Sequence, residues 1–388
     1  MTPAARLQAA AELLDQILDG APAEKVLTGW ARRSRYAGSK DRAAIRDHVF
    51  DALRCRRSYA ALGGVETGRG LMVGAVRAAD QDPAEFFTGE GHAPAPLTEA
   101  EQSSHLPTDD EAMNLPDWVI TEFKDSLGDH ATDVAMTLQH RAPVMLRVNL
   151  RKTSRDQAIA LLADEAIVAE PAAISDTALI VTQGPRKINN SAPYREGLVE
   201  LQDGGSQALV DRMALQDGLS VLDYCAGGGG KTLAMAGRIK GRFYAHDANP
   251  RRLKDLPDRA KRAGVSVKLL EPSELSRHAP FDVVLCDAPC SGSGSWRRSP
   301  ESKWSLTPQG LADLNATQDE ILDTSQSLVG PGGSLVYATC SVLLVENQHR
   351  VAAFLEQHPT WRLSWQQDWM PGLQNDGFFA ACLTRIAE

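Results

Sequence analysis

The chain has 388 residues and the composition of an ordinary globular protein, with 43% hydrophobic residues, 23% charged residues and a net charge of −9. It has no run of eighteen apolar residues and starts without the apolar core of an export signal, so we expect a cytoplasmic protein without a transmembrane helix. Its six cysteines follow neither a disulfide framework nor zinc-site spacing, which predicts reduced thiols and no structural metal.

Residues 1–80 carry apolar side chains at helical spacing, as in "LQAAAELLDQIL", and predict a small all-helical domain. Within it, residues 31–58 hold nine basic and three acidic side chains, a local charge of +6 in a chain whose total is acidic. That segment is either a solvated helix surface or a nucleic-acid contact. Residues 81–140 combine a linker rich in Pro, Gly and acids with a return to helical pattern.

Residues 141–195 alternate strand and helix patterns and predict a small α/β module. From residue 196 to 388 the alternation becomes regular, and a "GPGG" turn precedes one of the strands. The expected strands span 219–225, 242–248, 265–271, 281–289, 334–341, 361–369 and 377–386. This pattern predicts an α/β domain with a mostly parallel sheet covered on both faces, in which ligands bind at the carboxyl ends of the strands.

A glycine-rich loop, "VLDYCAGGGGKT", follows the first strand of that domain and places Gly227–Gly230 just before a helix. Such a loop is either a tight packing turn or a place where a ligand approaches the backbone. A P-loop is excluded because Cys225 stands where that motif requires glycine. Asp247 ends the next strand about twenty residues further on, where an acid accepts ribose hydroxyls, so the pair favours an adenosine-bearing cofactor.

Two cysteines follow the ends of two later strands, Cys290 after "DAP" and Cys340 after Thr339. If these strands are neighbours in a doubly wound sheet, both thiols face the pocket that the glycine loop borders. A carboxylate beside two thiols, here Asp287, fits covalent catalysis by a thiolate nucleophile. Cys225 and Cys286 lie within predicted strands and are favoured as core residues.

Three segments together, "DYCAGGGGKT", "DAPCSGSGSWRRSPESKW" and "YATCSVLLVENQ", resemble the S-adenosylmethionine-dependent RNA cytosine-5 methyltransferases, whose mark is a Pro-Cys and a Thr-Cys dipeptide. "MLRVNLRK" is similar to the small RNA-binding module of that family, and the N-terminal helices resemble a NusB-like domain, as in the RsmB-type 16S rRNA methyltransferases. The resemblance implies a NusB-like domain over 1–80, a linker with helices over 81–140, an α/β RNA-binding module over 141–195 and a Rossmann-like methyltransferase domain over 196–388.

The resemblance implies methyl transfer from S-adenosylmethionine to carbon 5 of a cytosine in RNA, most simply 16S rRNA, through a covalent cysteine–cytosine intermediate. It makes Cys340 the nucleophile and Cys290 the residue that assists product release, with Asp287 and Lys231 as further catalytic residues. The implied cofactor contacts are Cys225, Ala226, Gly227, Gly228, Gly229, Gly230, Lys231, Asp247, Glu271 and Asp287. The implied RNA contacts are Arg147, Arg297, Arg298 and Lys303, while Trp296 and Trp304 either stack on a base or fill the core.

Three alternatives remain beside this hypothesis. The same chemistry could act on tRNA, or the chain could be a ribosome assembly factor that binds RNA without catalysis. A DNA cytosine methyltransferase would share the Pro-Cys dipeptide, but it is not expected to have the Thr-Cys dipeptide or the RNA-binding modules. We expect a monomer with RNA as its partner and with neither a membrane nor a metal.

Overall fold

The structure is a computed structural model that describes residues 1–386. It divides into two compact units, the first made of residues 1–141 and 296–306, and the second of residues 142–295 together with the chain from 307 onward. Among the described residues, no helix has both the length and the apolar character needed to cross a membrane.

The first unit is entirely helical, as the apolar periodicity of residues 1–80 predicted. The side chain of Thr2 caps α1 by accepting a hydrogen bond from the backbone N–H of Ala5. Leu14, Ile45 and Leu71, from three different helices, meet in its core. Its helices are α1 (Pro3–Leu18), α2 (Ala23–Arg33), α3 (Ser39–Arg54), α4 (Arg56–Gly63), α5 (Gly68–Ala78), α6 (Glu99–Gln102), α7 (Asp109–Ala112), α8 (Asp117–Leu127), α9 (Ala131–Thr137) and α16 (Glu301–Ser305), with 3₁₀ turns at Pro83–Glu85 and Gly128–His130.

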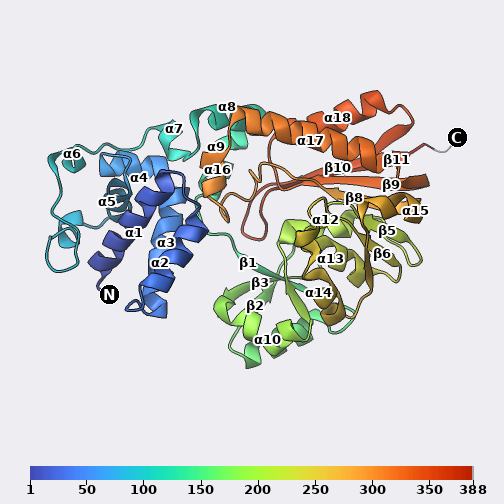
Figure 1. Ribbon diagram of the computed structural model, residues 1–388, viewed down its shortest axis with the longest axis horizontal. Helices are drawn as coiled ribbons and strands as arrows, with labels where there is room; N and C mark the ends of the chain where they lie inside the picture. Colours follow the sequence, from blue (N-terminus) through green and yellow to red (C-terminus); the bar gives the residue numbers. More distant parts are fainter. Residues whose placement is uncertain (387–388) are drawn as a thin grey trace. The chain divides into compact units, whose positions relative to one another are not determined.

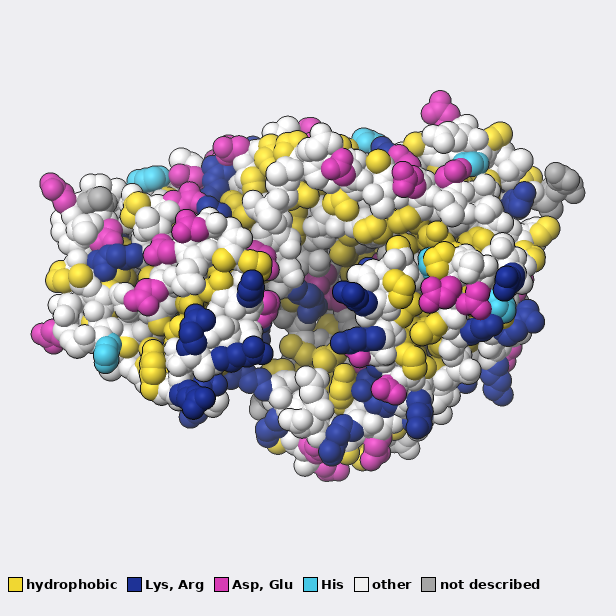
Figure 2. Space-filling view, in the orientation of Figure 1, with side chains coloured by type: hydrophobic (Ala, Val, Ile, Leu, Met, Phe, Trp, Pro, Cys, Tyr) yellow, Lys and Arg dark blue, Asp and Glu magenta, His cyan; other side chains and the backbone are white. Residues whose placement is uncertain are grey.

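Basic side chains gather on the surface of this unit. Figure 2 shows Lys and Arg side chains over α2 and α3, the part of the chain to which the sequence assigns a local charge of +6. A clustered positive surface of this kind is suited to a phosphate backbone contact, and it is equally found on solvated helices. Both interpretations of this segment, a solvated helix surface and a nucleic-acid contact, require that its basic side chains are exposed.

Residues 296–306 belong to the helical unit although they follow the cysteine loop of Cys290 in the chain. Trp296 is 1% exposed and stacks on Phe123, with ring centroids 5.8 Å apart. The Lys303 ammonium donates to the carbonyl of Arg54 at 2.8 Å, and the Trp304 indole N–H donates to the carbonyl of Leu53 at 2.7 Å. Those two carbonyls are at the C-terminal end of α3, where backbone acceptors have no partner within the helix.

The second unit contains a small four-stranded sheet with strand order β2–β3–β1–β4, antiparallel throughout. Its strands are β1 (Val144–Val148), β2 (Val168–Pro171), β3 (Ala178–Gln183) and β4 (Val199–Leu201), accompanied by α10 (Arg155–Asp164), a 3₁₀ turn at Pro185–Asn190 and α11 (Ala192–Arg195). Leu146, Leu162 and Leu179 are fully buried between the sheet and α10. The fourth strand lies beyond residue 195, so this sheet extends past the boundary drawn from the sequence.

The large sheet of the second unit has seven strands in the order β10–β11–β9–β8–β5–β6–β7. The strands from β9 to β7 run parallel, and β10 and β11 add an antiparallel edge. The bounds are β5 (Ser220–Asp223), β6 (Arg242–Ala245), β7 (Val267–Leu269), β8 (Phe281–Asp287), β9 (Val329–Thr339), β10 (Trp361–Trp369) and β11 (Phe378–Arg385). This arrangement confirms the predicted Rossmann-like fold class, and the strand order reverses between β5 and β8, where open α/β sheets bind ligands.

Helices cover both faces of the large sheet, with α17 and α18 on one side and α12, α13 and α14 on the other (Figure 1). Alternate residues of β8 divide between the two cores: Val284 packs toward α17 and α18, and Leu285 packs toward α12 and α13. The bounds are α12 (Gly204–Arg212), α13 (Gly230–Arg238), α14 (Leu256–Ala263), α15 (Leu275–His278), α17 (Pro308–Gln326) and α18 (Gln348–Gln357), with 3₁₀ turns at Pro250–Leu253, Pro272–Glu274 and Leu344–Glu346.

Strand β9 begins five residues earlier than the sequence predicted. The segment expected to be a "GPGG" turn is part of the strand, because Val329 pairs with Phe281 before the register shifts. Gly332, with φ +71°, absorbs that irregularity. The carboxyl end of the strand, which positions Cys340, lies where the sequence places it.

Candidate active site

The two cysteines predicted to act together lie side by side at the carboxyl ends of neighbouring strands. β8 and β9 are parallel, with Asp287 paired to Ala338, so the loops that follow them leave the sheet at the same edge. The sulfur atoms of Cys290 and Cys340 are 3.4 Å apart, and both side chains are partly exposed. This is hydrogen-bond distance for two sulfur groups, so one thiol can donate to the other.

The surroundings of the two thiols favour a thiolate on Cys340. A hydrogen bond from Cys290 lowers the pKa of Cys340 against the opposing effects of burial and of the Asp287 charge, and the Ser295 hydroxyl at 3.7 Å and the Lys231 ammonium lower it further. The same hydrogen bond, together with burial, raises the pKa of Cys290 well above its ordinary value. Within this pair, the opposite directions of the two shifts favour a thiolate on Cys340 over one on Cys290.

A buried ion pair lies beside the cysteines. The Lys231 ammonium, in the first turn of α13, is 2.6 Å from the Asp287 carboxylate and 5.0 Å from the centroid of the Phe378 ring. Burial disfavours the charged amine, but the attraction and the hydrogen bond of Asp287 outweigh it, and the pKa of Lys231 is raised. Lys231 is 8% exposed while a third of the Asp287 side chain stays accessible, so the carboxylate can face a substrate from a position that the lysine holds.

The glycine loop and Asp247 fit an adenosine-bearing group. Gly227 has φ +53° and donates its N–H to the Asp247 carboxylate at 2.8 Å, and the N–H of Asn249 donates to the other carboxylate oxygen at 2.9 Å. The oxygen that accepts from Asn249 keeps a second lone pair for a ribose hydroxyl, while the other oxygen also lies 3.3 Å from the Arg252 guanidinium. Gly229 has φ +78°, and a Cβ there would lie 2.3 Å from Leu256, so packing also requires glycine at this position.

The remaining predicted cofactor residues surround this loop without a contact that defines a ligand. Cys225 is half-buried, and burial raises its pKa, as expected for an unreactive thiol. The N–H of Ala226 donates to the carbonyl of His246, and Glu271 lies exposed after β7, where it begins a 3₁₀ turn. Their cofactor contacts stay predictions. Within residues 1–386, no cluster of three His, Cys, Asp or Glu side chains is arranged to hold a metal ion.

Two acidic residues that sequence reasoning missed lie under this site. Asp223 ends β5, is fully buried and accepts a hydrogen bond from the Thr232 hydroxyl at 2.6 Å, and burial raises its pKa to about 7. Its only sequence signal is its place just before the glycine loop. Glu346 is also fully buried and contacts both cysteine loops.

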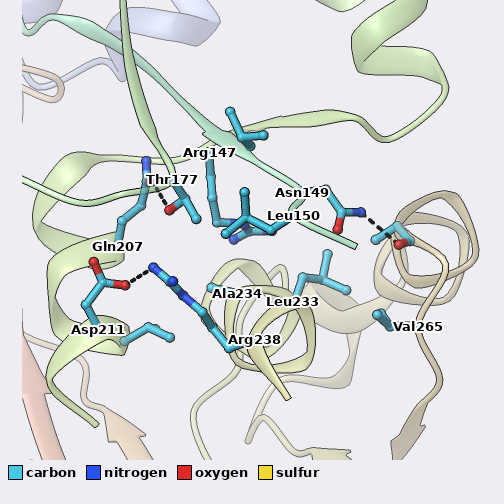
Figure 3. A pocket seen from close by; sticks show the side chains of 14 residues that line it. Arg147, Asn149, Leu150, Thr177, Gln207, Asp211, Leu233, Ala234, Arg238 and Val265 are labelled. Carbon is cyan, nitrogen blue, oxygen red and sulfur yellow. Dashed lines mark hydrogen bonds and ion pairs between the residues drawn. The ribbon is translucent and has the colours of Figure 1, made fainter. Parts of the chain in front are cut away.

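The expectation that Arg147 contacts RNA is wrong in this structure, because the residue is buried. Its guanidinium donates to the Gln202 side chain at 2.5 Å and to the carbonyl of Gly230 at 2.8 Å, so it joins the small sheet to the start of α13. Figure 3 shows Arg147 and Arg238 beside a cavity of about 20 Å³ between β1, α12 and α13. That space has room for about one water molecule and is lined by neither cysteine loop.

Burial also removes two of the other predicted RNA contacts. Arg297 is 3% exposed and Lys303 is 2% exposed, because the segment 296–306 packs into the helical unit. Trp296 is likewise a core residue, as the simpler interpretation held. Arg298 is exposed, and its contact with RNA stays a prediction.

The buried Lys303 gives a testable stability effect. Burial lowers its pKa from 10.5 to about 7. Between pH 7 and pH 10.5 the unfolded chain carries a proton on Lys303 that the folded chain lacks. The free energy of unfolding therefore decreases as the pH falls from 10.5 to 7. We expect Lys303→Met to remove this loss, on the order of a few kcal/mol. Urea unfolding of the full chain at about pH 7 and about pH 9.5 checks it, and equal pH dependence in the wild type and the variant would contradict it.

Comparisons with known proteins point to one family. Residues 210–383 match the family described as 16S rRNA methyltransferase RsmB/F, and residues 115–188 match the RsmF/B-like ferredoxin-like domain. The ribosomal RNA small subunit methyltransferase B of Vibrio cholerae is 34% identical over 70% of this chain and 65% of its own length, and that of Salmonella arizonae is 33% identical over 72% and 68%. The alignments thus span about two thirds of the length of these relatives.

Solved structures share the fold. The crystal structure of the protein PH0851 superposes with a TM-score of 0.77 at 25% identity and covers 99% of both chains. A methyltransferase homologue from Pyrococcus horikoshii superposes with a TM-score of 0.63 at 22% identity, covering 72% of this chain and 98% of its own.

Proposed function

Since this chain belongs to the RsmB/F family of 16S rRNA methyltransferases, we propose that it methylates carbon 5 of a cytosine in 16S rRNA through a covalent bond to Cys340. S-adenosylmethionine is the methyl donor of this family. The observation that supports the cysteine mechanism most strongly is the pair of sulfur atoms 3.4 Å apart whose pKa values are displaced in opposite directions.

Carbon 5 of cytosine is a poor nucleophile until a thiolate adds to carbon 6. The Cys340 sulfur forms the bond to carbon 6, and the electrons of the 5,6 double bond become available at carbon 5. The chemistry supplied by bound S-adenosylmethionine is an electrophilic methyl group for that activated carbon. For release, the carbon 5 proton passes to solvent water, the electrons of the carbon 5–hydrogen bond re-form the 5,6 double bond, and the bond between carbon 6 and sulfur breaks to return the Cys340 thiolate. The Cys290 thiol stabilises this departing thiolate by donating a hydrogen bond to it.

The base needs a partner for its ring nitrogens while this happens. Asp287 ends β8, three residues before Cys290, and its carboxylate keeps an accessible edge, so it can hold the base and exchange a proton with it. The Lys231 ammonium holds that carboxylate in place. Asp247 and the glycine loop would hold the adenosine part of the cofactor. The base reaches these groups only after leaving its stack, as for other enzymes that modify a base.

The direct test is methyl transfer from methyl-labelled S-adenosylmethionine to unmodified 16S rRNA, to tRNA and to assembling small subunits, followed by nucleoside analysis. Label in 5-methylcytosine of 16S rRNA supports the proposal. Label in 5-methylcytosine of tRNA alone would show that the reaction is as proposed but that the substrate is tRNA. Binding to rRNA without label in any RNA would favour an assembly factor.

A variant with basic residues of α2 and α3 neutralised would show whether the helical unit contributes to RNA affinity, with salt dependence as the signature of phosphate contacts.

A further inference from the structure

A single buried carboxylate joins the loops that hold the two cysteines. Glu346 is fully buried and lies in the 3₁₀ turn that follows the Cys340 loop. One of its oxygens accepts the backbone N–H of Ser291 at 2.7 Å, and the other accepts the Ser341 hydroxyl at 2.5 Å and the hydroxyl of Ser291. Ser291 and Ser341 are the residues that immediately follow Cys290 and Cys340, so Glu346 holds each loop one residue away from its thiol.

Further hydrogen bonds fix Glu346 and the loops around it. Gln318 of α17 donates to the Glu346 carboxylate at 3.1 Å and to the carbonyl of Pro289 at 3.0 Å. The Tyr337 hydroxyl donates to the backbone carbonyl of Glu346 at 2.6 Å. The hydroxyls of Ser293 and Ser341, one from each loop, are 2.8 Å apart. A carboxylate with this many donors is rigid, and losing it would leave several buried polar groups without an acceptor.

The charge of Glu346 acts unequally on the two thiols. The hydrogen bond with Cys340 raises the pKa of Cys290, the negative charge of Glu346 adds to that rise, and the backbone N–H of Gly292 acts against it. The groups that act on Cys340 are Cys290, Asp287, Ser295 and Lys231. Glu346 therefore opposes a thiolate on Cys290, whereas at Cys340 the charge of Asp287 opposes a thiolate and Lys231 supports one.

From this geometry we propose that Glu346 is a positioning residue that holds the two cysteine loops together and keeps the shared proton on Cys290, which makes Cys340 the thiolate. Its consequence for methyl transfer rests on the proposed function, but the state of the thiols does not. The geometry and the charge act in the same direction. Separation of the loops removes the S–H donor from Cys340, and loss of the charge makes Cys290 a better thiolate.

Alkylation of the full-length protein tests this without RNA or cofactor. Wild type and Glu346→Gln are treated with limiting iodoacetamide between about pH 6 and about pH 10, and the modification of each cysteine is quantified by peptide mass spectrometry. Wild type is expected to react faster at Cys340. In Glu346→Gln the ratio of Cys340 to Cys290 modification is expected to fall about tenfold at neutral pH, which corresponds to about one pKa unit. The matched control is Glu356→Gln on the exposed face of α18, which removes the same charge and should keep the wild-type ratio.

An unchanged ratio in Glu346→Gln, or equal changes in rate at both cysteines, would overturn the proposal and leave Glu346 a purely structural residue. If Glu346→Gln does not fold, Ser341→Ala replaces it, because it removes one hydroxyl donor from the same network. The expected change then has the same direction and a smaller size, and its absence again overturns the proposal. A wild type that shows selective Cys340 alkylation but no methyl transfer would refute the proposed function alone.

Discussion

Cys340→Ala is expected to abolish methyl transfer to RNA, with a loss of at least about 10⁴-fold in the single-turnover rate. Without the thiolate there is no addition to carbon 6, and burial and the charge of Glu346 still raise the pKa of Cys290 when the Cys340 side chain is absent. Binding of S-adenosylmethionine should stay near the wild-type level, because the groups that fit adenosine lie on the glycine loop and at Asp247. Quenched-flow transfer of labelled methyl groups and equilibrium binding of the cofactor measure the two effects.

The control is Cys382→Ala, which removes a buried thiol from β11 at a distance in sequence from both cysteine loops. Cys382→Ala should lower the free energy of unfolding and leave the single-turnover rate of methyl transfer unchanged. If Cys340→Ala retains more than about a hundredth of the wild-type rate, the nucleophile is another group.

Asp287→Asn is expected to reduce the rate of methyl transfer by about 10²- to 10⁴-fold, the range typical of a general acid or base. The amide keeps the shape of the side chain but removes the charge that holds the Lys231 ammonium at 2.6 Å. Burial then acts on Lys231 with less opposition, from the charges of Cys340 and Asp223 alone, and the pKa of Lys231 falls from the raised value. Single-turnover rates at saturating RNA and cofactor measure the loss.

An exposed aspartate on α17 gives the matched control. Asp313→Asn removes the same charge from a solvent-facing turn and should leave the rate unchanged. A loss below about tenfold in Asp287→Asn, with normal folding, would contradict a role for this carboxylate in holding the base.

Much of the fold and the centre of the site can be predicted from the sequence. The apolar pattern predicts the strands of the large sheet, and neighbouring parallel strands end at the same edge of a sheet. Cys290 and Cys340 could be placed together in this way, fifty residues apart in the chain. The glycine loop and Asp247 could be paired by the same logic. The early start of β9 was missed, because a segment with three glycines and a proline has the composition of a turn, whichever strand it pairs with.

The residues that the sequence misplaced all depend on tertiary contacts that have no local pattern. "WRRSPESKW" is irregular and basic, which is typical of an exposed loop, yet Lys303 is buried and its side-chain amine donates to a carbonyl at the end of α3. Arg147 lies on a strand whose alternation does not show that the guanidinium bonds to a carbonyl in the glycine loop. Glu346 belongs to "YATCSVLLVENQ", where nothing in the pattern assigns it a role, and only its contacts to Ser291 and Ser341 show its place in the site.

The central claim is that Cys340 attacks and Cys290 assists release, and the Cys290→Ala variant tests it most directly. The variant is incubated with 16S rRNA and S-adenosylmethionine, and protein–RNA adducts are separated on a denaturing gel, with the attached cysteine identified by mass spectrometry. We predict that a methylated adduct accumulates on Cys340, because the leaving thiolate has lost the hydrogen bond from Cys290. A Cys290→Ala variant that turns over without adduct, together with an adduct on Cys290 in Cys340→Ala, would reverse the two roles and contradict the account.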